Sequence, residues 1–237
     1  MSFLSPRVSA THDFYAPVHK GLRLALCRLM IRLGSVDASN RGAVAIVLAD
    51  LRAHMILSAS HLDHEEREIH TALERRAPGA ANDLYADHQH HRASFARIET
   101  AVNAVEAAGP DQRAAALHRL YLTFSRFVAD DFTHMAEEEE EILPVLQDLF
   151  TDGELMAIEG RIVASMPPER TVAFTQMMIP AGGPAERVAL LSGVRQGMIR
   201  DGAPPEAFAD LLRFGAKPSL PAADFEALVA ALDVEVA

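Results

Sequence analysis

The stretch Asp131-Phe-Thr-His-Met-Ala-Glu-Glu-Glu-Glu-Glu-Ile-Leu-Pro144 decides the fold, because it sets His134 and Glu138 four residues apart in a run with helical periodicity. On a helix this spacing is one turn, so both side chains share a face. The same spacing occurs earlier, in His61-Leu-Asp-His-Glu65. Two helices that carry the same pair predict one shared metal site.

Apolar residues recur at steps of three and four in four long runs, which predicts four amphipathic helices. Short connections at Gly34–Gly42, Pro78-Gly79 and Gly109-Pro110 separate these runs. Because Pro144 falls where the fourth pattern could still be helical, we expect a kink or an end there. The fold class is therefore all-α, with an up-and-down antiparallel four-helix bundle.

Three segments follow from the positions of proline and glycine along the chain. Residues 1–12 lack periodicity and are predicted to be a flexible arm, and residues 13–150 form the bundle. Prolines cut residues 151–237 into short pieces with few titratable groups on their apolar faces, such as Ala185–Arg200 and Ala222–Leu232. This part is predicted to be a helical C-terminal subdomain without chemistry of its own.

Composition excludes several classes of partner. The chain has 237 residues and a net charge of −11, and its sequence contains no cluster of Lys and Arg. This argues against a surface that binds nucleic acid or an anionic membrane. No secretory signal and no apolar run long enough to span a bilayer are found, which favours a cytoplasmic protein. The single cysteine, Cys27, excludes a disulfide framework and a thiolate-rich metal site. Metal ligands would then be nitrogen and oxygen atoms.

The inward stripes of the four helices carry ionisable residues where a core needs apolar ones. The candidate ligands are His19, His61, Glu65, His88, His91, His134 and Glu138. Burying these groups without partners would cost several kcal/mol per charge, so we predict that a metal pair compensates them. Five imidazoles and two bridging carboxylates suit two octahedral ions with one position left for a small ligand.

Iron fits this ligand set best, followed by manganese, whereas zinc needs only four ligands. The two carboxylates would offset much of the charge of two divalent ions, and an oxo or hydroxo bridge would balance further oxidation.

Each candidate also has a purely structural interpretation. The paired His and Glu could lie on a solvated face, and His91 could be a core histidine that leaves His88 as the only ligand of its helix. We assign His54, His64 and Asp131 to the core, the surroundings of the site or the surface. The remaining histidines and acids are interpreted as surface groups: His12, His70, His90, His118 and residues 137–141 apart from Glu138.

Several of these residues also carry a family resemblance. His19 in His-Lys-Gly-Leu-Arg, the stretch His61-Leu-Asp-His-Glu-Glu66, Asp87-His88, and His134-x3-Glu138-Glu139 before Ile-Leu-Pro resemble the hemerythrin-like, or HHE cation-binding, domain. The match covers about residues 13–148. The resemblance implies a four-helix bundle with a non-haem di-iron centre that binds dioxygen, nitric oxide or peroxide, or that senses iron and oxygen.

The pattern departs from that of the oxygen-carrying members, which place two histidines four residues apart on the third helix and end with an aspartate. Here His88 and His91 are three apart and Glu138 closes the pattern. This is more similar to members involved in stress response, iron repair and iron sensing. Two function classes stay open: a module that binds or senses a small ligand in oxidative or nitrosative stress or iron homeostasis, and a redox enzyme acting on peroxide, nitric oxide or dioxygen. A tyrosine at the centre, with Tyr15 and Tyr121 as candidates, would favour the enzyme.

Overall fold

The computed structural model describes residues 10–234, and within them every regular element is a helix or a helical turn. The all-α prediction is therefore confirmed. In chain order the elements are α1 Tyr15–Ser35, α2 Arg41–His64, the π-helical turn η1 Glu65–His70, α3 Thr71–Arg76, α4 Asn82–Ala107, α5 Pro110–Glu137, the π-helical turn η2 Glu138–Ile142, α6 Leu143–Leu149, α7 Asp152–Ser165, α8 Pro168–Met178, the 3-10 turn η3 Ile179–Ala181, α9 Pro184–Arg200, α10 Pro205–Asp210, the π-helical turn η4 Leu211–Ala216, the 3-10 turn η5 Lys217–Ser219 and α11 Ala222–Leu232.

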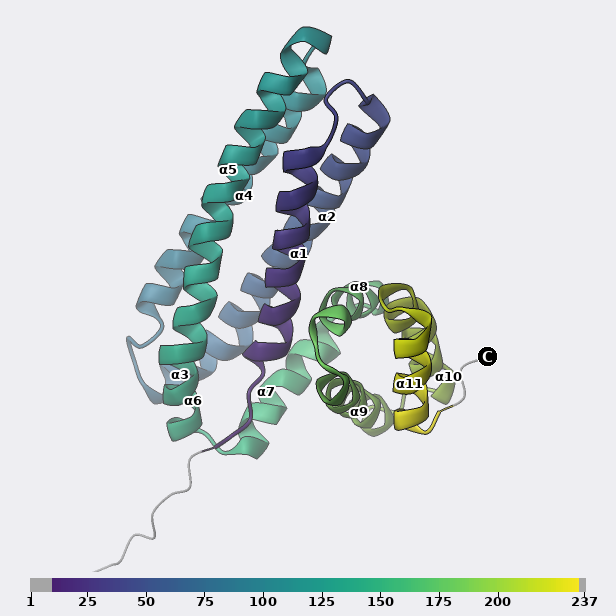
Figure 1. Ribbon diagram of the computed structural model, residues 1–237. Coiled ribbons are helices and arrows are strands. Elements are labelled where there is room, and N and C mark those ends of the chain that lie inside the picture. The colour runs from purple at the N-terminus through teal and green to yellow at the C-terminus, as the bar shows by residue number, and fades with distance from the viewer. Residues whose placement is uncertain (1–9, 235–237) are drawn as a thin grey trace, which may run out of the picture.

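The four longest helices lie side by side (Figure 1). α1 packs against α2 and α5, and α4 packs against the same two helices, so the four surround a common interior. Asn40 caps α2 by accepting a hydrogen bond from the Ala43 amide at 3.0 Å, and Pro110 occupies the first turn of α5. The connections predicted from glycine and proline therefore occur close to their expected places.

Two apolar clusters fill this interior and leave a polar layer between them. One cluster includes Leu26 of α1, Leu51 of α2 and Phe124 of α5. The other includes Tyr15, one turn before His19, and Ile69 and Leu73, which follow Glu65. Burial of each large side chain stabilises the fold by about 1.5–3 kcal/mol. The apolar packing above and below the polar layer therefore holds the four helices in a fixed position along their axes relative to one another.

The two π-helical turns begin at the two glutamates of the sequence pattern. η1 starts at Glu65 and η2 starts at Glu138. A π-helical turn takes up one extra residue, and such turns occur frequently at functional sites. The helical run does not end at Pro144, which lies in the first turn of α6, so the irregularity expected there lies in the π-helical turn just before it.

The segment predicted as a flexible arm is partly held in place. Residues 1–9 of it lie outside the described residues. Ala10 is buried, and the amides of Thr11 and His12 both donate to Asp152 Oδ1 at 2.7 Å. His12 also contacts Glu159 at 2.8 Å. The prediction is therefore wrong for residues 10–12, because α7 supplies acceptors that sequence periodicity does not reveal.

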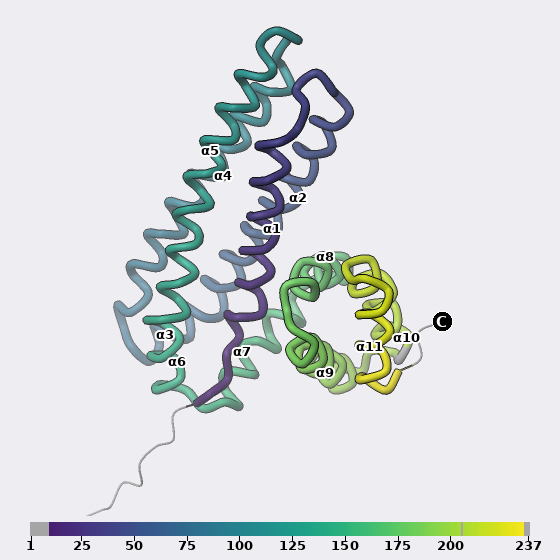
Figure 2. The backbone as a smooth tube through the Cα atoms, viewed as in Figure 1, coloured from purple at the N-terminus to yellow at the C-terminus, as the bar shows by residue number. Residues whose placement is uncertain are grey.

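The helices after α7 form a ring beside α1 (Figure 2). The predicted pieces Ala185–Arg200 and Ala222–Leu232 occur as α9 and α11. α8 approaches α1 closely at Gly21, where an added Cβ would lie 3.1 Å from Met178 Cα. Within the described part of residues 151–237, the buried residues are apolar apart from Thr175 and Gly215.

The helical run Arg41–Arg76 is long and apolar enough to cross a membrane, with a mean hydropathy of 1.5 in its best window. This differs from the sequence expectation that no such run exists. Core helices of soluble proteins pass the same test, although only 33% of this window is buried. The run also carries His61 and Glu65 on its inner face, beyond the apolar half.

Candidate metal centre

Six of the seven predicted ligands converge in the polar layer. Their ligand atoms form two groups, and within each group all atoms lie within 4.8 Å of one another. One group is His19, His61, Glu65 and Glu138, and the other is Glu65, His88, His134 and Glu138. All six residues are buried. Glu65 and Glu138 belong to both groups, so they occupy the positions that bridging carboxylates would take.

In the first group, the distances from imidazole nitrogen to carboxylate oxygen are short. His61 Nε2 lies 3.1 Å from Glu65 Oε1, and His19 Nε2 lies 3.4 Å from Glu138 Oε2 and 3.8 Å from Glu65 Oε1. His19 comes from α1, His61 from α2 and Glu138 from the end of α5. Three helices thus supply one set of donors.

The second group has the same form. His88 Nε2 lies 3.6 Å from Glu65 Oε2, and His134 Nε2 lies 3.6 Å from Glu138 Oε2. The two imidazoles face each other with their Nε2 atoms 3.2 Å apart. Each group therefore combines two imidazoles with both carboxylates.

Hydrogen bonding does not account for this arrangement. His19 Nε2 and all four carboxylate oxygens of Glu65 and Glu138 are buried without a hydrogen-bond partner among the described residues. An unpaired buried carboxylate costs several kcal/mol, and cations are the usual compensation. Neutral imidazole and carboxylate donors in this number fit two octahedral ions with positions left open. The residues present therefore fit a metal pair.

Without metal, burial of Glu65, Glu138 and His19 close together shifts the pKa of each group. Burial, reinforced by the charge of Glu138, raises the pKa of Glu65 to about 8. Burial also acts on Glu138, but contacts with His19 and the charge of His134 outweigh it and lower its pKa. Burial opposes protonation of His19, yet Glu138, Glu139 and Glu65 raise its pKa well above the usual value. The neighbouring carboxylates thus favour the protonated form of His19 in the metal-free chain.

Two other candidate ligand imidazoles are kept neutral by their surroundings. Burial and neighbouring histidines lower the pKa of His61 well below its usual value. The same causes lower the pKa of His88 to about 2. A neutral imidazole keeps the lone pair that a metal ion needs.

The glutamate after each bridging candidate supports a histidine on another helix. Glu139 Oε1 lies 2.8 Å from His19 Nδ1, and Glu66 Oε1 lies 3.1 Å from His88 Nδ1. Each of the two groups thus contains one histidine whose outer nitrogen is held by a carboxylate. Such contacts fix the orientation of a ligand ring. The interpretation of Glu139 as a solvated surface acid is wrong, since its side chain is only 27% exposed.

An arginine completes each of these contacts. Arg23 Nη1 donates to Glu139 Oε1 at 2.7 Å, and Arg92 Nη1 donates to Glu66 Oε1 at 2.6 Å. Arg92 also donates to Asp63 at 2.7 Å. Sequence reasoning missed both arginines, although Arg23 lies one turn after His19 and Arg92 lies one turn after His88.

His91 lies beside the centre and outside both groups. Its ring packs edge to face against the ring of His134, with 4.8 Å between the ring centroids, and its Nδ1 is 3.9 Å from Asp131 Oδ1. Asp131 is buried, and burial raises its pKa to about 7. A role of His91 as a ligand stays a prediction, and Asp131 belongs to the surroundings of the site as expected.

His70 is the main residue that the sequence interpretation placed wrongly. The sequence predicts a surface group, but His70 is fully buried, and both ring nitrogens lack a hydrogen-bond partner among the described residues. Its ring centroid lies 4.8 Å from that of His88. A helix with 3.6 residues per turn points residue 70 away from residue 65, whereas the π-helical turn η1 brings it inside.

Tyr15 reaches the centre and Tyr121 does not. Tyr15 is 1% exposed, its ring stacks on that of His19 at 5.1 Å, and its hydroxyl has no partner among the described residues. Tyr121 instead packs against Gly34 and His118.

The other histidines agree with the sequence interpretation in most respects. His54 is buried with Ser58 Oγ 3.5 Å from its Nε2, and burial lowers its pKa to about 4. His64 is half-buried against Phe174. His90 and His118 are exposed, whereas His12 is half-buried in its contact with α7.

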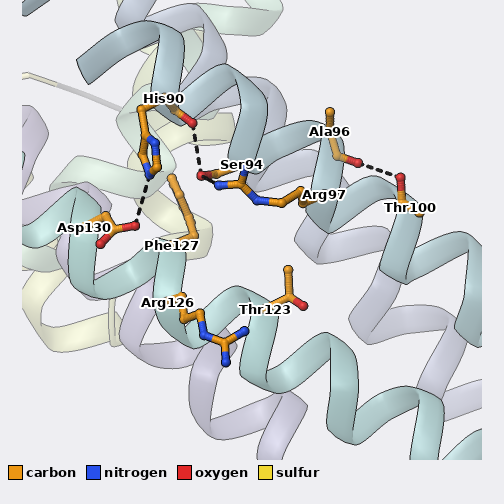
Figure 3. Close-up of a pocket in the computed structure, with 9 residues that line it drawn as sticks. All are labelled: His90, Ser94, Ala96, Arg97, Thr100, Thr123, Arg126, Phe127 and Asp130. Atoms are coloured by element: carbon orange, nitrogen blue, oxygen red, sulfur yellow. Dashed lines mark hydrogen bonds and ion pairs between the residues drawn. The ribbon is translucent and has the colours of Figure 1, made fainter. Parts of the chain in front are cut away.

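A cleft of about 540 Å³ lies between α4 and α5 (Figure 3). None of the seven predicted ligands lines it, and several of its polar groups bind one another. Ser94 donates to the His90 carbonyl, Arg97 donates to Ser94 at 2.7 Å, and His90 lies 3.4 Å from Asp130. The buried polar layer, and not this cleft, is the candidate site.

Comparison with protein-family models, with curated proteins and with solved structures found no match to this chain. The geometry of the buried residues is therefore what bears on function.

Proposed function

We propose that this chain is a hemerythrin-like protein whose four-helix bundle binds two non-haem iron ions. The observation that carries this proposal is the pair of buried, hydrogen-bond-deficient carboxylates Glu65 and Glu138, each shared by two groups of donors. The contacts of α1 and α4 with α2 and α5 support an up-and-down bundle, which would supply donors from four helices. His19 and His61 would hold one ion, and His88 and His134 the other.

Iron is the metal that this donor set supports best. Two imidazoles and two shared carboxylates give each ion four protein ligands, which leaves positions open on an ion that prefers six. Four-coordinate zinc would leave no position for a ligand, so it fits less well than iron or manganese.

The function proposed is binding or sensing of a small ligand, such as dioxygen, nitric oxide or peroxide, in stress response or iron homeostasis. An iron pair would supply redox chemistry and a position for such a ligand. The chain itself supplies buried donors, ring orientation through Glu66 and Glu139, and exclusion of water by the two apolar clusters.

A redox enzyme is the second candidate, and Tyr15 is the observation that favours it. A phenol beside the centre can donate a hydrogen bond or a proton to a bound ligand, which a purely apolar lining cannot do. The presence of Tyr15 at the centre therefore favours a catalyst over a protein that only binds a ligand reversibly.

The experiment is an optical spectrum of the iron-loaded protein under air, peroxide and nitric oxide, followed over time. A spectrum that changes and reverses when the ligand is removed supports binding or sensing. Multiple turnovers of peroxide or nitric oxide per chain support the enzyme. An iron-loaded protein whose spectrum none of these ligands alters would contradict both.

A further inference from the structure

We propose that Tyr15 and His70 are the hydrogen-bonding groups that hold a small anionic ligand at the metal centre. This inference rests on the proposed iron centre and adds the face on which the ligand is held and the chemistry that recognises it. Neither residue belongs to the groups of candidate metal ligands.

The polar atoms of Tyr15 and His70 are buried without partners. Tyr15 is 1% exposed and His70 is fully buried, yet the phenol oxygen and both imidazole nitrogens have no hydrogen-bond partner among the described residues. Leaving a buried polar group unsatisfied is costly, and native proteins avoid it unless the group serves a ligand, a water or an ion.

Tyr15 and His70 occupy matching positions along their helices. Tyr15 lies one turn before His19 on α1, and its ring stacks on that histidine at 5.1 Å. His70 lies at the end of η1, one wide turn after Glu65, and its ring lies 4.8 Å from His88. Because α1 and α2 run in opposite directions, both positions fall on the same side of the metal layer, toward the apolar cluster around Leu73.

Tyr15 and His70 lie beside different halves of the centre. Tyr15 stacks on His19 of one donor group, and the His70 ring lies against His88 of the other. The two groups share Glu65 and Glu138, so Tyr15 and His70 approach one joined centre from two helices.

The chemistry of the pair indicates the class of ligand. A phenol has one O–H and a neutral imidazole has one N–H, so together they offer two donors. Apolar neighbours such as Phe14, Leu84 and Leu143 lower the local polarity, which strengthens a hydrogen bond to a charged acceptor. A small anion with electron-rich terminal atoms, such as peroxide, fits this environment.

The opposite side of the metal layer offers a contrast. There His54 has Ser58 as a close polar neighbour at 3.5 Å, and the surrounding side chains Leu51 and Phe127 are apolar. The unpartnered Nδ1 of His91 lies beside Asp131 at 3.9 Å. The other ring nitrogens without a hydrogen-bond partner among the described residues, His19 Nε2 and His134 Nδ1, belong to candidate metal ligands.

The experiment uses azide as the probe anion on the iron-loaded protein. Tyr15→Phe and His70→Leu are compared with two matched controls that lie away from this face, Tyr121→Phe and His54→Leu. Iron content is measured first. We expect both test variants to keep their iron and to weaken azide binding about tenfold or more, as loss of a hydrogen bond to a charged group predicts. The control variants should stay within about twofold of the unaltered protein.

Azide affinity within about twofold of the unaltered protein in either test variant would overturn the proposal, as would an iron pair that does not bind azide at all. Loss of iron in a test variant would also overturn it, because the residue would then be a metal ligand. An unaltered protein without iron would instead contradict the proposed function.

Melting of the metal-free protein supplies a readout that does not depend on iron. Tyr15→Phe removes an unpartnered hydroxyl, so this variant should melt about 2 °C or more above the unaltered metal-free protein. A fall of the same size would show that the hydroxyl is satisfied within the fold and would overturn its assignment as a free donor.

Discussion

Removal of the Glu139 carboxylate should weaken iron binding without touching a proposed ligand. In Glu139→Ala, His19 Nδ1 loses its acceptor at 2.8 Å and Arg23 loses its partner at 2.7 Å. The ring of His19 is then free to turn, and its Nε2 is no longer aimed at Glu65 and Glu138. The same reasoning applies to Glu66→Ala and His88, where the acceptor lies at 3.1 Å.

Two estimates give the size of this effect. Outer contacts of metal-bound histidines are worth about 10- to 100-fold in metal affinity. A hydrogen bond to a charged group contributes about 1.5–3 kcal/mol, which corresponds to a similar factor at about 1.4 kcal/mol per tenfold. We therefore expect Glu139→Ala to lower the affinity for iron about 10- to 100-fold. Glu66→Ala should fall at the lower end because its contact with the histidine is longer.

The assay is a competitive titration of iron-loaded protein with a chelator of known affinity. Glu140→Ala is the matched control, since Glu140 is the adjacent acid and is exposed. Glu139→Gln keeps an acceptor for His19 and should restore part of the affinity. If Glu139→Ala and Glu140→Ala release iron at the same chelator concentration, the contact does not orient His19 and the reasoning is refuted.

Other perturbations test the surroundings of the centre. Chelation should lower the melting temperature at neutral pH, and the melts with and without chelator should converge near pH 5, below the usual histidine pKa of about 6.5; superimposable melts at neutral pH would show that the polar layer is satisfied without metal. The sequence predicts His91 as a fifth imidazole ligand although it lies outside both donor groups, so His91→Leu should hold the second iron poorly, and full iron occupancy would remove His91 from the ligand set. Burial lowers the pKa of His54 to about 4. As the pH falls from 6.5 toward 4, His54 is protonated in the unfolded chain before it is protonated in the folded one, so the free energy of unfolding decreases. In the metal-free protein, His54→Leu should remove up to about 3 kcal/mol of that loss, and an equal slope for both proteins would contradict the assignment.

The spacing of histidine and glutamate made most of the centre predictable. His61 with Glu65 and His134 with Glu138 sit one helical turn apart, and this local rule holds because both pairs lie within or at the end of regular helix. Glycine and proline likewise marked the connections between the long helices. Depth along antiparallel helices then brought His19 and His88 to the same layer.

The features that could not be predicted from the sequence depend on irregular backbone and on contacts between helices. His70 lies five residues after Glu65, and only the π-helical turn η1 brings both to the interior. Glu66 and Glu139 look like solvated acids in a charged run, and their role depends on which histidine faces them from another helix. The buried position of Ala10 depends on α6, whose Gln147 carbonyl accepts a hydrogen bond from its amide at 3.0 Å.

The central claim is that Glu65 and Glu138 bridge two metal ions, and metal content per chain tests it most directly. The protein is loaded with ferrous iron, freed of excess, and analysed for iron and zinc beside Glu138→Ala and Glu140→Ala. We expect close to two irons per chain for the unaltered protein and for Glu140→Ala, and loss of most of both in Glu138→Ala, since each ion would depend on the shared carboxylate. A single zinc, or a folded protein without metal, would contradict it.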